Sequence, residues 1–306
     1  GIDALSDSGT VFISNGTYAP SINGENFPII MKSFVNLMGE SEEGTILDAE
    51  GSEGNPGRVI TMENCGNNII SDLQITGGFE LGDGTSQCRG GGIDIYQSHP
   101  TINRVTIKNN IALGVMCTGG GMYLFDSNPI LTEVTITSNS VTCETDLCGV
   151  GGITMSNSSP ELNQVIVSYN SAPIDGGISI YDSNPILNNV MIIGNLSEVG
   201  TGGISIADSN PILNNVLINS NSGNMAGGIR ISNSDANLSS VTISNNISTQ
   251  MGAGMTIEHS NPILTHVTVA NNTVTDEVNT IKLQSSYPTI VNSIIWGNNE
   301  NPISIA

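Results

Sequence analysis

A repeat of about 25 to 26 residues is the feature that most limits how this chain can fold. The stretch GGISIYDSNPILNNVMIIGN, residues 176–195, returns nearly unchanged as GGISIADSNPILNNVLINSN at residues 202–221. A repeat of this period indicates units that stack on one another, since a single unit cannot bury its own apolar face. The 306 residues are therefore expected to form one elongated body and not two ordinary domains.

Fixed marker residues keep the repeat in register. A proline, replaced once by alanine, recurs in each of eight repeats, and an asparagine follows ten residues later. These residues are Pro100, Pro129, Pro160, Pro185, Pro211, Ala236, Pro262 and Pro288, with Asn110, Asn139, Asn170, Asn195, Asn221, Asn246, Asn272 and Asn298. A serine precedes each proline position by two residues. This spacing predicts ladders of stacked side chains, in which each asparagine amide bonds the next.

Apolar residues between the markers alternate in short runs. Ile178 and Ile180 form the first run, Leu187 belongs to the second, and the third, residues 190–192, begins at Val190. Alternation with period two predicts three short strands per coil, each with one face toward a shared interior. The glycine pair before each first strand indicates a corner with positive φ or with closely approaching backbones. We therefore expect a parallel β-helix.

A leucine-rich-repeat solenoid is the alternative fold. Leu213, Val216, Ile218 and Asn221 also fit the pattern L-x-x-L-x-L-x-x-N. Such repeats commonly return through a helix or a 3₁₀ segment. Here the returning segment, GGISIADSNP, consists largely of glycine and β-branched residues and ends in proline. Its composition favours the β-helix.

The segment DSGTVFISNGTYAP, residues 7–20, resembles the opening of bacterial right-handed parallel β-helix proteins of the pectin-lyase-like class. In that class a Gly-x-Thr-Val strand and a Gly-Thr-Tyr turn follow a capping helix. The resemblance implies a right-handed coil, a secreted or surface location, and a remnant of the capping helix at residues 1–5. The repeats are also similar to those of chlamydial polymorphic outer-membrane proteins, but Ile136, Val167 and Ile192 stand where that family has phenylalanine.

The domain organisation follows from the repeat. Residues 1–306 are expected to form a single β-helix domain, in which residues 1–63 make irregular N-terminal coils and residues 64–298 make regular ones. Residues 299–306 resemble the start of a further, truncated coil. Connections are enlarged at residues 79–91, 111–120 and 140–151. Because insertions in a solenoid form loops on one face, we expect functional residues near these loops.

Four of the five cysteines lie in the enlarged loops. Cys88, Cys117 and Cys148 each stand four residues before the last glycine of their coil's pair, so neighbouring coils place them about 5 Å apart, within reach of a disulfide. The preferred pairing is Cys88 with Cys117 and Cys143 with Cys148, and a Cys117–Cys148 bond is the alternative. Cys65 remains as a buried small residue. A zinc or iron-sulfur site is disfavoured because a close C-x-x-C pair is missing. Paired cysteines predict an extracellular or cell-surface location.

Aromatic residues gather on the strand that follows the glycine pair. Tyr96, Phe125 and Tyr181 share one outward register and Tyr123 flanks them. Asp94, Asp126 and Asp182 lie beside these rings. Rings that stack on apolar sugar faces, next to carboxylates that bond hydroxyls, indicate a glycan-binding groove for a polysaccharide or cell-surface glycan. The alternative is that the enlarged loops cover the rings and bury them as a small second core.

The charge balance limits the partners. The chain has 28 acidic and 7 basic residues and a net charge of -21, which disfavours nucleic acid and anionic membrane surfaces. No apolar run reaches the roughly 18 residues that a transmembrane helix needs, so we expect no membrane insertion. Candidate Ca²⁺ ligands are the acidic turns with Asp48, Glu50, Glu53 and Asp83, although they lack the EF-hand spacing. Solvated acidic turns are the alternative, and no other cofactor is indicated.

Catalytic residues are few. A polysaccharide lyase needs a basic residue that abstracts a proton next to a uronate carboxyl group, and only Arg104 and Lys108 lie close together on one coil. The sequence therefore favours a non-catalytic extracellular or cell-surface repeat protein for adhesion, display or glycan binding. The alternatives are a polysaccharide lyase or another carbohydrate-active enzyme, and a structural subunit of an extracellular filament that associates with itself through exposed coil ends.

Overall fold

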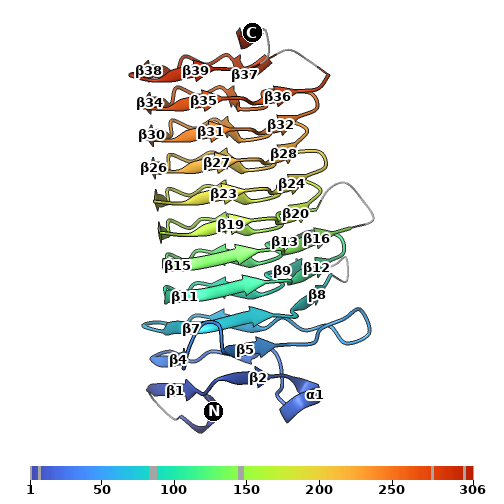
Figure 1. Ribbon diagram of the computed structural model, residues 1–306. Coiled ribbons are helices and arrows are strands. Elements are labelled where there is room, and N and C mark those ends of the chain that lie inside the picture. The colour runs from blue at the N-terminus through green and yellow to red at the C-terminus, as the bar shows by residue number, and fades with distance from the viewer. Residues whose placement is uncertain are drawn as a thin grey trace.

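The computed structural model describes residues 2–5, 8–82, 88–143, 148–276, 279–298 and 301–305. Figure 1 shows one column of stacked coils, with β1 and α1 at one end and the C-terminus at the other. The described strands pair in parallel, and the chain is a right-handed parallel β-helix of about 11 coils. The described residues contain a single α-helix of 4 residues, so the expected β-helix is confirmed and the leucine-rich-repeat alternative is wrong.

Sheet 1 has 11 strands, and those of the central coils follow the glycine pairs. They are β3 (Ile29–Ile30), β6 (Ile60–Glu63), β10 (Ile93–Tyr96), β14 (Met122–Phe125), β17 (Ile153–Ser156), β21 (Ile178–Tyr181), β25 (Ile204–Ala207), β29 (Ile229–Ser232), β33 (Met255–Glu258), β37 (Asn279–Gln284) and β40 (Asn301–Ile305). Each coil therefore contributes one residue to every row of side chains that crosses the strands of this sheet.

Sheet 2 has 19 strands. Its three long strands are β7 (Ile69–Thr76), β11 (Thr101–Lys108) and β15 (Ile130–Thr137). In the other coils the same path is divided into two strands: β1 (Gly9–Ile13) and β2 (Gly16–Tyr18), β4 (Val35–Gly39) and β5 (Thr45–Asp48), β18 (Glu161–Asn163) and β19 (Ile166–Ser168), β22 (Ile186–Asn188) and β23 (Met191–Ile193), β26 (Ile212–Asn214) and β27 (Leu217–Asn219), β30 (Asn237–Ser239) and β31 (Thr242–Ser244), β34 (Ile263–Thr265) and β35 (Thr268–Ala270), and β38 (Thr289–Val291) and β39 (Ile294–Trp296). In these coils the chain thus bends within sheet 2, between its first and its second strand.

Sheet 3 follows the asparagine ladder and has 8 strands. They are β8 (Phe79–Leu81), β12 (Ile111–Leu113), β16 (Ser140–Thr142), β20 (Ser171–Ala172), β24 (Leu196–Ser197), β28 (Ser222–Gly223), β32 (Ile247–Ser248) and β36 (Thr273–Val274). The three runs predicted from the sequence correspond to sheet 1 and to the two halves of sheet 2. Sheet 3 has no such signal because its strands are short and bury at most one residue each, as β24 buries Ser197 beside exposed Leu196.

The remaining elements are short. β9 (Cys88–Arg89) and β13 (Cys117–Thr118) form a separate pair within the enlarged loops. A 3₁₀ turn, η1 (Ile2–Ala4), stands where the capping-helix remnant was expected, and α1 (Pro20–Asn23) follows β2. Among the described residues, no helix has the length and apolar character needed to cross a bilayer.

The core is one continuous apolar column. In the coil of β21, the residues Ile178, Ile180, Leu187, Val190 and Ile192 are at most 1% exposed, and their copies above and below belong to the same cluster. Burial of a side chain of this size stabilises the fold by roughly 1.5 to 3 kcal/mol. The predicted inward positions are therefore those that hold the coils together.

The predicted asparagine ladder is confirmed. Asn195 Nδ2 donates to Asn221 Oδ1 of the next coil at 3.0 Å and to the Val167 carbonyl of the preceding coil at 3.0 Å. Its Oδ1 accepts from both Nδ2 and the backbone N–H of Asn170. Each amide therefore bonds the coils on both of its sides while fully buried.

The predicted serine ladder is also confirmed. The backbone N–H of Ser183 donates to Ser209 Oγ at 2.9 Å, and Ser183 Oγ donates to the Tyr181 carbonyl at 2.7 Å. The serine hydroxyl thus links one coil to the next where the chain leaves sheet 1.

The glycine pairs occupy their corners because of close packing. A Cβ on Gly177 would lie 2.4 Å from the Gly203 carbonyl oxygen, although φ at Gly177 is not positive. Positive φ occurs instead at other corners of the coil, at Asp182 (46°), Asn189 (55°) and Gly194 (66°). Of the two reasons expected for the glycines, close approach of backbones therefore applies.

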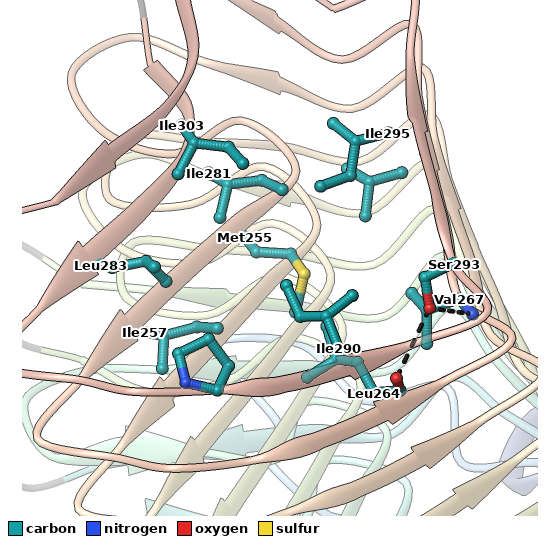
Figure 2. Close-up of a pocket in the computed structure, with 12 residues that line it drawn as sticks. Met255, Ile257, Leu264, Val267, Ile281, Leu283, Ile290, Ser293, Ile295 and Ile303 are labelled. Carbon is teal, nitrogen blue, oxygen red and sulfur yellow. Dashed lines mark hydrogen bonds between the residues drawn. The ribbon is translucent and has the colours of Figure 1, made fainter.

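Both ends of the column continue the sheets. β1 pairs with β4 in the register Gly9↔Val35, so the N-terminal coils belong to the same column. At the other end β40 pairs with β37 in the register Ile303↔Ile281. Figure 2 shows the apolar side chains that line the interior here, including Ile290, which is 45% exposed. The described part of the chain leaves this end of the core open.

The asparagine ladder can be tested by substitution. We expect Asn195→Ala to destabilise the protein by roughly 3 kcal/mol, because several buried groups lose their hydrogen-bond partners. Asn184, which accepts a bond from the Asn210 backbone N–H on the surface of the same coil, is the matched control. Asn184→Ala should cost less than about 1 kcal/mol, since water can replace the lost bond. Urea unfolding followed by circular dichroism measures both, and equal effects would contradict a special role for the buried ladder.

Candidate ligand-binding face

Four consecutive coils of sheet 1 place their last outward residues in one row. Strand register aligns Tyr96 with Phe125, Phe125 with Ser156, and Ser156 with Tyr181. The rings of Tyr96 and Phe125 stack with centroids 5.2 Å apart and planes inclined by 8°. We call this row, Tyr96, Phe125, Ser156 and Tyr181, the aromatic strip.

The aromatic strip has one position without a ring. Ser156 lies between Phe125 and Tyr181, whose Cα atoms are roughly 10 Å apart because each coil adds about 4.8 Å. A ring-shaped ligand above Ser156 would lie one coil from each aromatic residue, close to the spacing at which Tyr96 and Phe125 stack. Tyr181 is 49% exposed and available to such a ligand.

Two exposed carboxylates border the aromatic strip. Asp126 and Asp182 directly follow Phe125 and Tyr181, and their φ angles of 49° and 46° mark the corner at which sheet 1 ends. Gln97 Nε2 donates to Asp126 Oδ2 at 3.2 Å. These groups offer hydrogen-bond acceptors next to the rings, as the sequence predicts for Asp126 and Asp182.

Tyr123 and Asp94 do not belong to this exposed face. They occupy the other outward position of the strands, where they are only 4% and 2% exposed. The enlarged loops cover this position, and Arg89 of β9 lies over the rings of both Tyr96 (5.3 Å) and Tyr123 (5.5 Å). Burial raises the pKa of Tyr123. Tyr123 and Asp94 are therefore covered, whereas Asp126, Tyr181 and Asp182 remain exposed candidates.

A buried group of charges supports the loops over Asp94. Arg58 forms ion pairs with Glu80 and with Asp94 Oδ2, and Arg89 Nη2 lies 3.4 Å from the same oxygen. Burial raises the pKa of Asp94, while Arg58 and Arg89 act in the opposite direction. Because these charges neutralise one another, Asp94 and the two arginines form a largely buried network that supports the loops.

Disulfides fix the same loops. Cys88 is bonded to Cys117, which joins β9 to β13, and Cys143 is bonded to Cys148. This is the preferred of the two pairings considered from the sequence. Cys65 is a buried free cysteine, and burial raises the pKa of its thiol. The Cys88–Cys117 bond sets the position of Arg89 and so the edge of the aromatic strip.

The acidic turns do not assemble a metal site in the described part of the chain, which contains no group of three or more His, Cys, Asp or Glu placed to hold an ion. Asp48 Oδ1 accepts the Glu50 backbone N–H, and the Glu50 carboxylate accepts hydrogen bonds from Ser21. Glu53 is exposed, and Asp83 lies outside the described residues. These turns are therefore fixed by hydrogen bonds to the chain itself.

The two basic candidates lie on sheet 2, away from the aromatic strip. Arg104 forms a bidentate ion pair with Asp72, at 2.6 and 2.9 Å, and this pair lowers the pKa of Asp72. Lys108 ends the same strand, β11. Since the Arg104 guanidinium already bonds a carboxylate and is always protonated, it is poorly suited to act as a base.

The fold and its stacked rings define a right-handed parallel β-helix protein with an aromatic-lined face. Residues 2–191 match the family described as "Protein of unknown function (DUF1565)", and the chain belongs to this family. The search of curated proteins found no match.

Three solved structures are reported as similar to this chain at low sequence identity. The enzymatically active domain of tailspike protein 2 from bacteriophage CBA120 is 11% identical with a TM-score of 0.57, and the match covers 96% of this chain and 48% of that one. A polygalacturonase from Erwinia carotovora ssp. carotovora is 14% identical, with a TM-score of 0.45 and coverage of 100% and 91%. The surface protein and adhesin PfbA of Streptococcus pneumoniae is 11% identical, with a TM-score of 0.46 and coverage of 97% and 91%. At 11% identity, the likeness to the tailspike domain concerns the fold alone.

One buried acid near this face was missed by sequence reasoning. Asp175, between β20 and β21, is 6% exposed, and its Oδ1 accepts the Thr201 backbone N–H at 3.1 Å. Burial raises the pKa of Asp175 to about 6. The residue stands just before a glycine pair, where the repeat elsewhere has neutral residues such as Thr201 and Ala226. That substitution in an otherwise regular column was its only sequence signal.

The raised pKa of Asp175 predicts a pH-dependent stability. An acid whose pKa is higher in the folded state stabilises the fold at low pH, and this contribution is lost as pH rises from about 4 through about 6. The loss is on the order of 3 kcal/mol. We expect Asp175→Asn to remove this pH dependence and to raise the melting temperature at pH 7. Asp182→Asn, in the same coil but exposed, is the control, and a matching change there would contradict the assignment.

Proposed function

We propose that this protein is an extracellular, non-catalytic β-helix that binds a glycan through the aromatic strip. The observation that carries the proposal is the stacked pair Tyr96 and Phe125, followed by the ringless position at Ser156 and the half-exposed Tyr181. Aromatic faces accept the apolar faces of sugar rings, and the neighbouring carboxylates of Asp126 and Asp182 accept hydrogen bonds from hydroxyl groups.

The rigidity of the face supports binding without a large entropic cost. β14 and β17 each pair with a neighbouring strand on both sides. The Cys88–Cys117 bond and Arg89 fix the edge of the loop beside Tyr96. Preorganised side chains lose little freedom when a ligand binds. The two disulfides also support an oxidising, extracytoplasmic location.

The charges near the aromatic strip support binding in preference to catalysis. A lyase that uses an arginine base needs that arginine free next to the substrate, whereas Arg89 and Arg58 are paired with buried Asp94. Incubation with polyuronate followed by ultraviolet absorbance of unsaturated ends separates the two functions. A sustained rise in absorbance would favour the lyase alternative.

Substitutions in the aromatic strip test the proposal. We expect Phe125→Ala and Tyr181→Ala each to weaken glycan binding about tenfold, because a stacking face worth more than 1 kcal/mol is lost. Affinity electrophoresis in gels containing xylan, galactomannan, hydroxyethylcellulose or polygalacturonate measures the retardation. Tyr287→Ala, at an 81% exposed tyrosine outside the row, is the control. Equal retardation of all variants would remove the aromatic strip as the binding site.

Self-association is a second candidate function, favoured by the single pairing of the outermost described strands. In the described chain β38, β39 and β40 each pair with one strand, as β1, β2 and β3 do at the opposite end. A second copy stacked head to tail would continue sheets 1 and 2 in parallel and form an open filament.

This association has a direct test. Sedimentation velocity should show a sedimentation coefficient that rises with concentration, and Ile294→Lys with Ile305→Lys should abolish the rise by placing charge on residues that are 59% and 77% exposed at this end. Leu196→Lys, on the side of the column and 49% exposed, is the control. A concentration-independent monomer would exclude the filament.

A further inference from the structure

A second groove, of about 590 Å³, lies on sheet 2 where its two halves meet. Amide side chains and aliphatic side chains from three neighbouring coils line the groove. They are Gln164, Asn189 and Asn215, with Ile166, Met191 and Leu217. Each pair comes from one coil, so the same combination of amide and aliphatic group repeats about every 4.8 Å along the column.

The bend of the backbone creates this groove. Gln164, Asn189 and Asn215 have φ angles of 55°, 55° and 53°, which turn the chain sharply between the two halves of sheet 2. Asn215 Nδ2 donates to Asn189 Oδ1 at 2.7 Å, so these exposed amides form an ordered row. The concave shape is thus built into every coil of the groove.

One end of the groove is acidic. Glu133 and Glu42 line it there. Glu42 belongs to the connection between β4 and β5, which passes over β7 (Figure 1) and is held by a 2.6 Å hydrogen bond from Thr106 Oγ1 on β11. No lysine or arginine is among the described residues that line the groove. An anionic ligand would therefore meet like charge without a compensating base.

We propose that this groove binds an extended, uncharged polysaccharide whose sugar units follow the axis of the column. Amides both donate and accept hydrogen bonds, which suits rows of sugar hydroxyls. The aliphatic side chains of the groove suit the apolar faces of the sugar rings. The step from one coil to the next is comparable with the length of one sugar unit in an extended chain, so successive units meet equivalent side chains.

The same spacing disfavours an extended peptide. A β-strand advances only 3.2 to 3.4 Å per residue, so its amides would not coincide with a row that repeats every 4.8 Å or so. Strands such as β22 and β23 are also paired on both sides, which leaves no backbone edge for an added strand.

This site goes beyond the proposed function because it lies on a different sheet from the aromatic strip. A column with a glycan site on sheet 1 and another on sheet 2 can hold two polysaccharide chains at once. The protein then links neighbouring chains, since occupation of one face leaves the other free.

The test uses a variant pair that the repeat itself supplies. Met191→Arg with Leu217→Arg fills the groove, whereas Ile186→Arg with Ile212→Arg adds the same charge in the same two coils, on β22 and β26 outside it. Both pairs point outward, and Ile186 and Ile212 are 38% and 39% exposed. Both Arg pairs are made in a protein that also carries Phe125→Ala and Tyr181→Ala, two substitutions that remove rings of the aromatic strip.

In affinity electrophoresis with hydroxyethylcellulose or galactomannan, the background protein should still be retarded. The groove pair should reduce the affinity at least about tenfold, which corresponds to 1.4 kcal/mol, and the control pair should leave it unchanged. Loss of all binding in the background, or equal effects of the two pairs, would overturn the groove while leaving the aromatic strip in place. Equally strong retardation by polygalacturonate would overturn the proposal that the ligand is uncharged. Melting temperatures establish that each variant is folded.

Discussion

The hydrogen bond between stacked asparagine amides is the interaction on which the rest of this structure depends. Each buried amide, such as Asn195, bonds the coil before it and the coil after it, so a coil cannot shift by one residue without leaving several buried groups unpaired. Register fixed in this way makes every outward position a row. The aromatic strip and the amide row of the groove both exist because the coils cannot slide.

Sequence alone predicts whatever follows from this register. Counting positions is enough to place Ile178 and Ile180 inward, to align Cys88 with Cys117, and to bring Phe125 into line with Tyr181. The reason is that stacked coils turn a linear period into spatial contact, so no knowledge of long-range packing is needed. The fold and the exposed half of the candidate site can therefore be predicted from the sequence.

What the sequence does not predict depends on contacts outside the period. Asp94 and Tyr123 fit an outward pattern, yet they are buried because Arg58 and Arg89, from irregular segments, lie against them. Sheet 3 cannot be predicted from the sequence because strands of two residues, such as Leu196–Ser197, are too short to show alternation. The reach of Glu42 to Thr106, across 64 residues, is likewise a feature of one loop and has no copy in the repeat.

The groove changes what the regular part of the column can do. Interruptions of a solenoid usually attract attention because they break symmetry, and the aromatic strip does lie beside such loops. A polymer of identical sugar units, however, is itself periodic, and it is best matched by a surface that repeats. Gln164, Asn189 and Asn215 occupy one corner position in successive coils where only residues that tolerate positive φ can stand. The corner that bends sheet 2 thus also supplies hydrogen-bonding groups at even intervals, so the constraint that builds the scaffold is the one that shapes a surface for a repeating ligand.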